Sequence, residues 1–244
     1  MGGYLKSTGR IFHDAIGNRG RLRLGMQQDT EPRAEDYDDL AARTIPDFDL
    51  FYATVADALP ETCEKVLELG CGTGILTARI RNAYPAAAVT CIDSSPAMLA
   101  VAREKPELEV VSFIGGDIRG PWPAGPYDAV VSAFCLIALD PEERQATITR
   151  AYDVLRPGGV FVTGCVFRPE RREEEMQFIA DWERFMRNAG LDAAEIRREL
   201  TSWDGARGRI PTREMFLTML EAAGFGRIRW PYLKGLYGVV VAER

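Results

Sequence analysis

Short apolar runs that alternate with helical patterns constrain the fold of this chain more than any other feature. Helical periodicity lies between most of these runs, at Ile75–Tyr84, Pro96–Glu104 and Pro141–Leu155. The runs are continuous and rich in Val and Ile, as expected for strands that are covered on both faces. Such alternation predicts right-handed βαβ units and a parallel sheet. The five predicted strands are Lys65–Leu69, Ala88–Ile92, Glu109–Ile114, Asp128–Ser132 and Val160–Val166.

The pattern changes after Phe167. A charged, helix-like insertion with large apolar residues follows, and we expect residues 168–212 to form a lid over a substrate pocket. A helix over Thr212–Ala223 and two closing runs, Gly226–Tyr232 and Leu236–Ala242, complete the chain. The closing runs are near enough to form an antiparallel hairpin. The sequence therefore predicts an α/β fold, a doubly wound, seven-stranded, mostly parallel sheet with an antiparallel C-terminal hairpin and a helical insertion.

Two segments precede the first predicted strand. Residues 1–35 are polar and carry scattered arginines, which predicts an N-terminal arm, and residues 36–244 are expected to form one domain. Helical periodicity runs from Asp36 to Leu59, and Pro46 is expected to divide it into two helices.

Composition narrows the classes of function. Acidic residues outnumber basic ones by 36 to 30, and the net charge of −6 argues against a nucleic-acid partner. No apolar run approaches the ~20 residues of a membrane helix. The five cysteines form no CxxC pair and His13 is the single histidine, so we expect no metal site, free thiols and a cytoplasmic location.

The loop Gly70-Cys71-Gly72-Thr73-Gly74 follows the first predicted strand. Glycines with this spacing let a ligand approach the backbone at the carboxyl edge of a parallel sheet. The third glycine stands one position too early for the dinucleotide fingerprint GxGxxG. Glu68, just before the loop, would repel a pyrophosphate and suits a ligand with a positive charge. These features favour S-adenosylmethionine, which carries a sulfonium and an ammonium group, over a nicotinamide dinucleotide.

The ends of the next three strands supply the other candidate cofactor residues. Asp93 ends the second strand, where a carboxylate can accept both ribose hydroxyls. Asp117 follows the third strand and can accept a hydrogen bond from the exocyclic amine of adenine. The remaining candidates are placed to cover the adenine or to lie near the reacting end: Ser94, Met98, Gly116, Ile118, Ser132, Ala133 and Phe134.

Five segments in this order resemble the class I S-adenosylmethionine-dependent methyltransferases. They are "VLELGCGTG", "CIDSSPAML", "GGDI", "YDAVVSAFCL" and "LRPGGVFV", and the resemblance covers about residues 36–167. It implies that S-adenosyl-L-methionine is the cofactor and that the fold supplies the cofactor site, while insertions supply the substrate site. The leading hypothesis is a methyltransferase that acts on a small molecule.

A narrower resemblance, carried by "LDPEERQATITRAYDVLRPGG", "NAGLDAAEI" and "LEAAGF", is to carboxy-S-adenosylmethionine synthase. In that family an arginine after the "EI" pair holds the new carboxylate, and Leu200 stands at that position here. Phe48 and Ala133 replace a tyrosine and an asparagine of the family. Non-methylating chemistry on the cofactor is therefore the alternative, and an inactive, methyltransferase-like binding partner is a third hypothesis.

The sequence identifies no compelling catalytic base. His13 and Tyr37 are weak candidates, because the first lies in the arm and the second at the start of the first predicted helix. Trp182 and Trp203 are aromatic residues of the insertion that can line a substrate cavity, and Arg198 can hold an acidic substrate. A homodimer formed through the arm or the insertion is left open.

Overall fold

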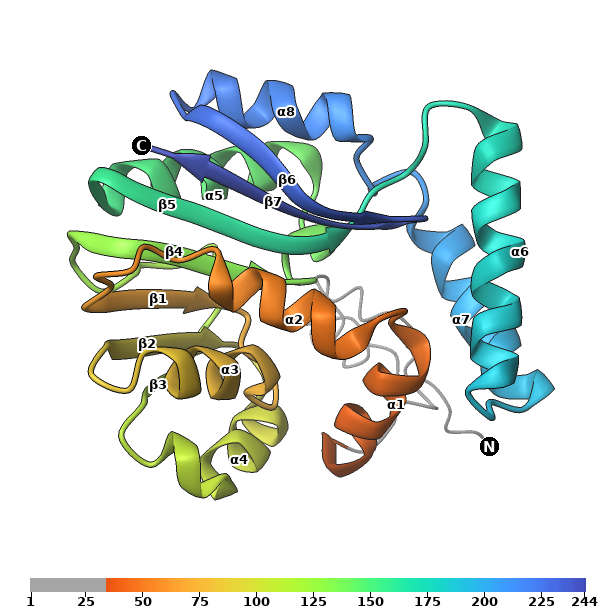
Figure 1. Cartoon of the computed structure of the whole chain (residues 1–244), viewed down its shortest axis with the longest axis horizontal. Coiled ribbons are helices and arrows are strands. Elements are labelled where there is room, and N and C mark those ends of the chain that lie inside the picture. The colour runs from red at the N-terminus through yellow and green to blue at the C-terminus, as the bar shows by residue number, and fades with distance from the viewer. Residues whose placement is uncertain (1–33) are drawn as a thin grey trace, which may run out of the picture.

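Seven strands form one sheet in the computed structural model, which describes residues 34–244 (Figure 1). The spatial order is β3-β2-β1-β4-β5-β7-β6. The strands are β1 (Lys65–Leu69), β2 (Ala88–Asp93), β3 (Ser112–Gly115), β4 (Tyr127–Ala133), β5 (Leu155–Val166), β6 (Gly226–Lys234) and β7 (Tyr237–Glu243).

The first five strands are parallel and the sheet is doubly wound. Val66 of β1 lies between Val89 of β2 and Ala129 of β4, and β7 runs antiparallel to both β5 and β6. The strand order reverses between β1 and β4, and such a switch opens a crevice at the carboxyl ends of the strands. The predicted sheet and its antiparallel C-terminal hairpin are confirmed.

Helices cover both faces of the sheet, which explains why its central strands are mostly apolar. In Figure 1, α2 and α3 lie before the sheet, whereas α5 and α8 lie behind it and pack against each other. The helices are α1 (Tyr37–Thr44), α2 (Phe48–Asp57), α3 (Ile75–Ala83), α4 (Pro96–Glu104), α5 (Pro141–Val154), α6 (Arg172–Asn188), α7 (Ala193–Ala206) and α8 (Arg213–Ala222).

Local sequence signals set the helix starts. The Ser95 side chain accepts a hydrogen bond from the backbone N–H of Met98, with Pro96 at the first position of α4. The Thr212 hydroxyl accepts from the backbone N–H of Met215 at the start of α8. The expected break at Pro46 is also present, since it lies between α1 and α2.

Two strand boundaries differ from the sequence expectation. The third strand was expected from Glu109 but begins at Ser112, because a short 3₁₀ helix (η2, Pro106–Leu108) and a following turn occupy the preceding residues. β5 begins at Leu155, five residues before the expected Val160. A shift in register against β4 accommodates this extension, which contains two glycines.

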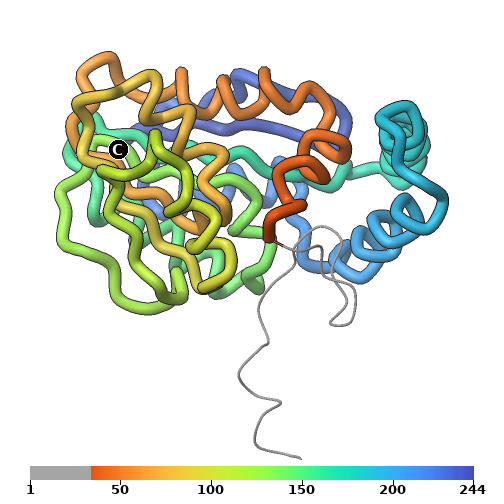
Figure 2. The backbone as a smooth tube through the Cα atoms, turned by 90° about the horizontal axis from the view of Figure 1, so that it is seen from below, coloured from red at the N-terminus to blue at the C-terminus, as the bar shows by residue number. Residues whose placement is uncertain are grey.

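The insertion after β5 forms α6 and α7, which pack on each other beyond the carboxyl ends of the strands (Figures 1 and 2). α1 lies between these two helices and the sheet, and it contacts α6. Within residues 34–244 the structure contains no helix that is long and apolar enough to span a membrane.

Candidate functional site

The loop after β1 has three glycines with positive φ angles: +68° at Gly70, +56° at Gly72 and +85° at Gly74. A Cβ on Gly70 would lie 2.4 Å from the Cβ of Cys135, so this position has no room for a side chain. A Cβ on Gly72 would meet nothing within 4 Å. The loop therefore presents Gly72 to open space at the edge of the sheet, where a ligand can approach its backbone closely.

Asp93, at the end of β2, fixes this loop. One oxygen of its carboxylate accepts from the backbone N–H of Gly72 at 2.8 Å, and the other accepts from that of Ser95 at 2.7 Å. The carboxylate thus ties the glycine loop to the start of α4. It also lines a cavity in front of the loop, which is the position that ribose recognition requires.

Glu68 lies in β1, two residues before the first glycine of the loop. Its side chain is 1% exposed, and its carboxylate accepts a hydrogen bond from the Thr77 hydroxyl at 2.7 Å. Burial raises the pKa of Glu68 to about 7, against the opposing effect of the Thr77 hydrogen bond. The carboxylate contacts Thr77 of α3 and Cys91 of β2, and it does not line the cavity.

The cavity at the carboxyl ends of the strands collects most of the predicted cofactor residues. Tyr37 of α1 also borders it. Cys71, Gly116 and Ser132 are adjacent in sequence to lining residues, and Gly74 is two residues from one, but none of the four lines the cavity. The predicted cofactor residues that do line it are Gly70, Gly72, Asp93, Ser94, Met98, Asp117, Ile118, Ala133 and Phe134.

Phe134 packs against α2 and also lines the cavity. Its φ angle is +59°, a left-handed conformation that is uncommon for a bulky residue. Its ring stacks on that of Phe51 in α2, with the centroids 5.1 Å apart. The strained backbone therefore turns the chain at the end of β4 while one edge of the residue remains at the cavity.

Sequence reasoning missed the wall that α1 contributes. Leu40, Ala41, Thr44 and Ile45 line the cavity, as do Arg119 and residues after β4 at Cys135, Ala138 and Leu139. The helical periodicity of α1 predicted a packed face, but it could not show that part of this face borders a cavity.

Contacts at both ends hold α1 in place. Asp38 accepts hydrogen bonds from the Thr73 hydroxyl of the glycine loop at 2.5 Å and from the Lys105 ammonium at 2.6 Å. At the other end, the backbone carbonyl of Thr44 accepts from the Trp182 indole at 2.7 Å and from the Tyr237 hydroxyl at 3.0 Å. The cavity wall is therefore connected to both the glycine loop and the insertion.

The predicted substrate residues lie in the insertion, away from the cavity lining. Trp182 and Trp203 are buried and pack edge to face, with their ring centroids 6.4 Å apart. The Trp203 indole donates a hydrogen bond to the buried Glu175, which also accepts one from the Arg207 guanidinium. Arg198 is exposed on α7. The Trp182 indole contacts α1 through the Thr44 carbonyl, and Trp203 packs on Trp182. Direct substrate contact by Trp182, Trp203 and Arg198 stays a prediction.

The buried Glu175 joins α6 to α7. Burial by itself would raise the pKa of this carboxyl group, but hydrogen bonds from Arg207, Arg172 and Trp203 together lower it below its usual value. His13 lies outside the described residues. Among the described residues, no group of three or more His, Cys, Asp or Glu side chains is arranged to hold a metal ion.

Known proteins resemble the chain in both sequence and fold. Residues 66–159 match the family model described as "Methyltransferase domain". A carboxy-S-adenosyl-L-methionine synthase from Chromohalobacter salexigens is 29% identical over 233 residues, which cover 89% of this chain and 83% of that protein. At 89% coverage the aligned part includes the insertion as well as the glycine loop.

Solved structures share the fold at low sequence identity. An O-methyltransferase family protein from Burkholderia thailandensis aligns with a TM-score of 0.62 at 16% identity, over 86% of this chain, which spans only 59% of that protein. The N-methyltransferase NodS from Bradyrhizobium japonicum, solved with S-adenosyl-L-homocysteine, aligns with a TM-score of 0.56 at 18% identity, over 82% of this chain and 88% of that one.

The strand order and the glycine loop beside an acidic strand end define a doubly wound α/β protein built to bind a nucleoside cofactor. That cofactor is S-adenosyl-L-methionine, in agreement with the matched family and the ligand of the NodS structure. Residues 66–159 match a methyltransferase domain, and the chain has the fold of the class I S-adenosylmethionine-dependent methyltransferases.

Proposed function

We propose that this enzyme transfers the methyl group of S-adenosyl-L-methionine to a small-molecule acceptor. The observation that carries the proposal is one cavity that joins the glycine loop, two carboxylates on adjacent strand ends and an apolar wall from α1. The proposal assigns the cofactor to the glycine-loop side and the acceptor to the α1 side.

The cofactor half is assigned from the chemistry of its lining. Asp93 accepts the ribose hydroxyls, and Asp117 accepts the exocyclic amine of adenine. Met98 and Ile118 provide apolar surfaces for the adenine ring, and Gly72 lets the amino-acid part approach the backbone. Ser94, Ala133 and Phe134 complete the proposed cofactor contacts.

The acceptor half is apolar. Leu40 and Ala41 on α1 and Ile45 directly after it face this side, together with Ala138 and Leu139 after β4. Such a lining favours a compact acceptor with apolar surface, which it would shield from water. When bound, the cofactor supplies an electrophilic methyl group on a positively charged sulfur. The residues of the chain contribute by aligning the two reactants and excluding water.

A proton acceptor is needed only if the accepting atom carries a proton. Cys135 lines the cavity, but burial raises the pKa of its thiol far above neutral pH, which makes it a poor base. Tyr37 offers a phenol at the cavity and is our candidate for orienting the acceptor.

A methyl-transfer assay tests the proposal. The purified chain is incubated with the cofactor and a panel of small phenols, amines and carboxylic acids, and mass spectrometry follows methylated products. A product 14 Da heavier than one acceptor, formed together with S-adenosylhomocysteine, is expected. Tyr37→Phe is the matched variant, and we expect it to slow the transfer while leaving cofactor binding intact. Binding without transfer to any acceptor would favour the inactive-partner hypothesis.

A second candidate function is synthesis of a carboxylated cofactor, which the similarity to the Chromohalobacter synthase supports. Leu200 borders a separate groove between α6 and α7 rather than the cavity, and it brings no charge to hold a carboxylate. The mass of the cofactor after incubation with candidate carboxylate donors separates the two functions, because replacing one hydrogen of the methyl group by a carboxyl group makes the cofactor 44 Da heavier.

We further propose that residues 168–212 act as a support for the α1 wall within one domain formed by residues 36–244. The Trp182 and Arg207 contacts described above favour this role.

The five free cysteines suit the reducing cytoplasm. Homodimerisation is a separate proposal that light scattering on the purified chain would test.

A further inference from the structure

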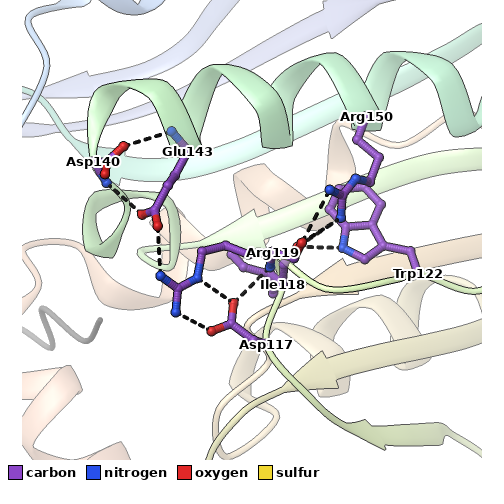
Figure 3. A network of polar contacts seen from close by, with 7 residues as sticks. All are labelled: Asp117, Ile118, Arg119, Trp122, Asp140, Glu143 and Arg150. Carbon is purple, nitrogen blue, oxygen red and sulfur yellow. Dashed lines mark hydrogen bonds and ion pairs between the residues drawn. The ribbon is translucent and has the colours of Figure 1, made fainter. Parts of the chain in front are cut away.

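Arg119 grips the carboxylate of Asp117 at the edge of the cavity (Figure 3). Its Nε donates to Oδ1 of Asp117 at 2.9 Å, and its Nη2 donates to Oδ2 at 2.5 Å. The backbone N–H of Arg119 also donates to Oδ1 at 2.8 Å. This two-point contact between a planar guanidinium and a carboxylate sets the plane of the carboxylate as well as its position.

The other end of the guanidinium is held by α5. Nη1 of Arg119 donates to Oε1 of Glu143 at 2.8 Å. Glu143 is part of a capping box, in which its Oε2 accepts from the backbone N–H of Asp140 at 3.1 Å and its own N–H donates to the Asp140 side chain at 2.8 Å. Arg119 therefore links the carboxylate of Asp117 to the first turn of α5, which the capping box holds in place.

The backbone of the same loop is held independently of the Arg119 side chain. Arg150 of α5 donates to the backbone carbonyls of Arg119, at 3.3 Å, and of Gly120. The Trp122 indole donates to the carbonyl of Ile118 at 2.7 Å, and the Arg150 guanidinium lies 5.0 Å from the Trp122 ring centroid. Loss of the Arg119 side chain should therefore leave the loop in place and remove only the two guanidinium contacts from the carboxylate of Asp117.

We propose that Arg119 is a positioning residue that makes the cavity specific for a 6-aminopurine. The side chain of Asp117 is 44% exposed, and the last torsion of an aspartate is broad unless its partners restrict it. Arg119 holds that carboxylate in one plane, so that one of its oxygens can also accept a hydrogen bond from the exocyclic amine of adenine. The inference rests on the proposed function, because it takes the adenine to lie beside Asp117.

The test compares two ligands on the same protein variants by isothermal titration calorimetry. One ligand is S-adenosylhomocysteine. The other is its deaminated analogue, in which a carbonyl oxygen replaces the exocyclic amine. In Arg119→Gln we expect S-adenosylhomocysteine to bind about tenfold more weakly, because the hydrogen bond between the charged Asp117 and the exocyclic amine loses its favourable geometry. Binding of the deaminated analogue should change less than twofold.

Two further variants sharpen the comparison. Arg119→Lys keeps the charge but cannot make the two-point contact. Its affinity for S-adenosylhomocysteine should therefore lie between those of the wild type and Arg119→Gln. Glu143→Gln keeps an acceptor for the capping box while weakening the anchor of Arg119, and we expect a smaller loss with the same ligand selectivity. Thermal unfolding of each variant verifies that it is folded.

Three results would overturn the inference. An equal loss for both ligands would show that Arg119 acts through general charge or loop structure. Unchanged binding of S-adenosylhomocysteine by Arg119→Gln would show that Asp117 needs no such support. A wild-type protein that binds neither ligand would instead refute the cofactor assignment, and with it both proposals.

Discussion

The buried carboxyl group of Glu68 makes the stability of this protein depend on pH in a way that one substitution can reveal. In the folded chain the pKa of Glu68 is raised to about 7 by burial, whereas an exposed glutamate titrates near 4.3. Between these two values the unfolded chain has lost the proton and the folded chain still holds it. The free energy of unfolding must therefore fall as the pH rises through this window, and it levels off above the folded pKa.

The size of the effect follows from the separation of the two pKa values. Each unit corresponds to about 1.4 kcal/mol, so Glu68 alone should lower the free energy of unfolding by roughly 2–3 kcal/mol between pH 5 and pH 8. Glu68→Gln removes this contribution while its amide oxygen can still accept the Thr77 hydrogen bond. The variant should thus gain stability relative to the wild type as the pH rises.

Urea unfolding of both proteins at several pH values between 5 and 8 measures the difference. Burial also raises the pKa of Glu199 to about 7, and Glu199→Gln serves as the matched control. It should remove a second, comparable share of the pH dependence, so that the double variant shows the flattest profile. A difference between Glu68→Gln and the wild type that is the same at every pH would refute the reasoning.

Three further predictions concern the glycine loop and the wall. Gly70→Ala places a Cβ against Cys135 and should lower the free energy of unfolding by roughly 2–4 kcal/mol, read from urea unfolding; an unchanged midpoint would contradict the close packing. Gly72→Ala has open space around it, so it should cost only about 1–2 kcal/mol of backbone strain yet weaken cofactor binding at least tenfold, as calorimetry will measure. Trp182→Phe leaves the Thr44 carbonyl with one donor instead of two and should cost about 1 kcal/mol, which a loss beyond ~3 kcal/mol would disprove.

Sequence patterns predicted the sheet well because local chemistry and tertiary position agree there. β1 begins and ends where its apolar run does, and α4 is bounded by its Ser95 cap and the end of its periodicity. The edge strand β3 was less well predicted, because a proline-started turn before Ser112 uses apolar residues that look like strand. The length of β5 depended on a register shift against β4, which leaves no signal in its own sequence.

The residues of the candidate site also fall into those that the sequence could predict and those that it could not. Gly72, Asp93 and Asp117 could be placed because strand ends in a parallel sheet meet at one edge, so that neighbours in space follow from the strand order. The walls from α1 and Arg119 could not, because they depend on how helices pack over that edge. Trp182 and Trp203 show the limit most clearly, since a buried indole that supports a wall and one that lines a cavity have the same sequence pattern.

Calorimetric titration of S-adenosyl-L-methionine into the wild-type chain and into Asp93→Ala tests the central claim most directly. The account predicts one site per chain in the wild type. It also predicts binding weakened by about tenfold to a hundredfold in the variant, because the ribose loses a charged acceptor and the glycine loop loses its tie to the carboxylate. Equal affinity for the two proteins, or no binding to the wild type at millimolar cofactor, would contradict it.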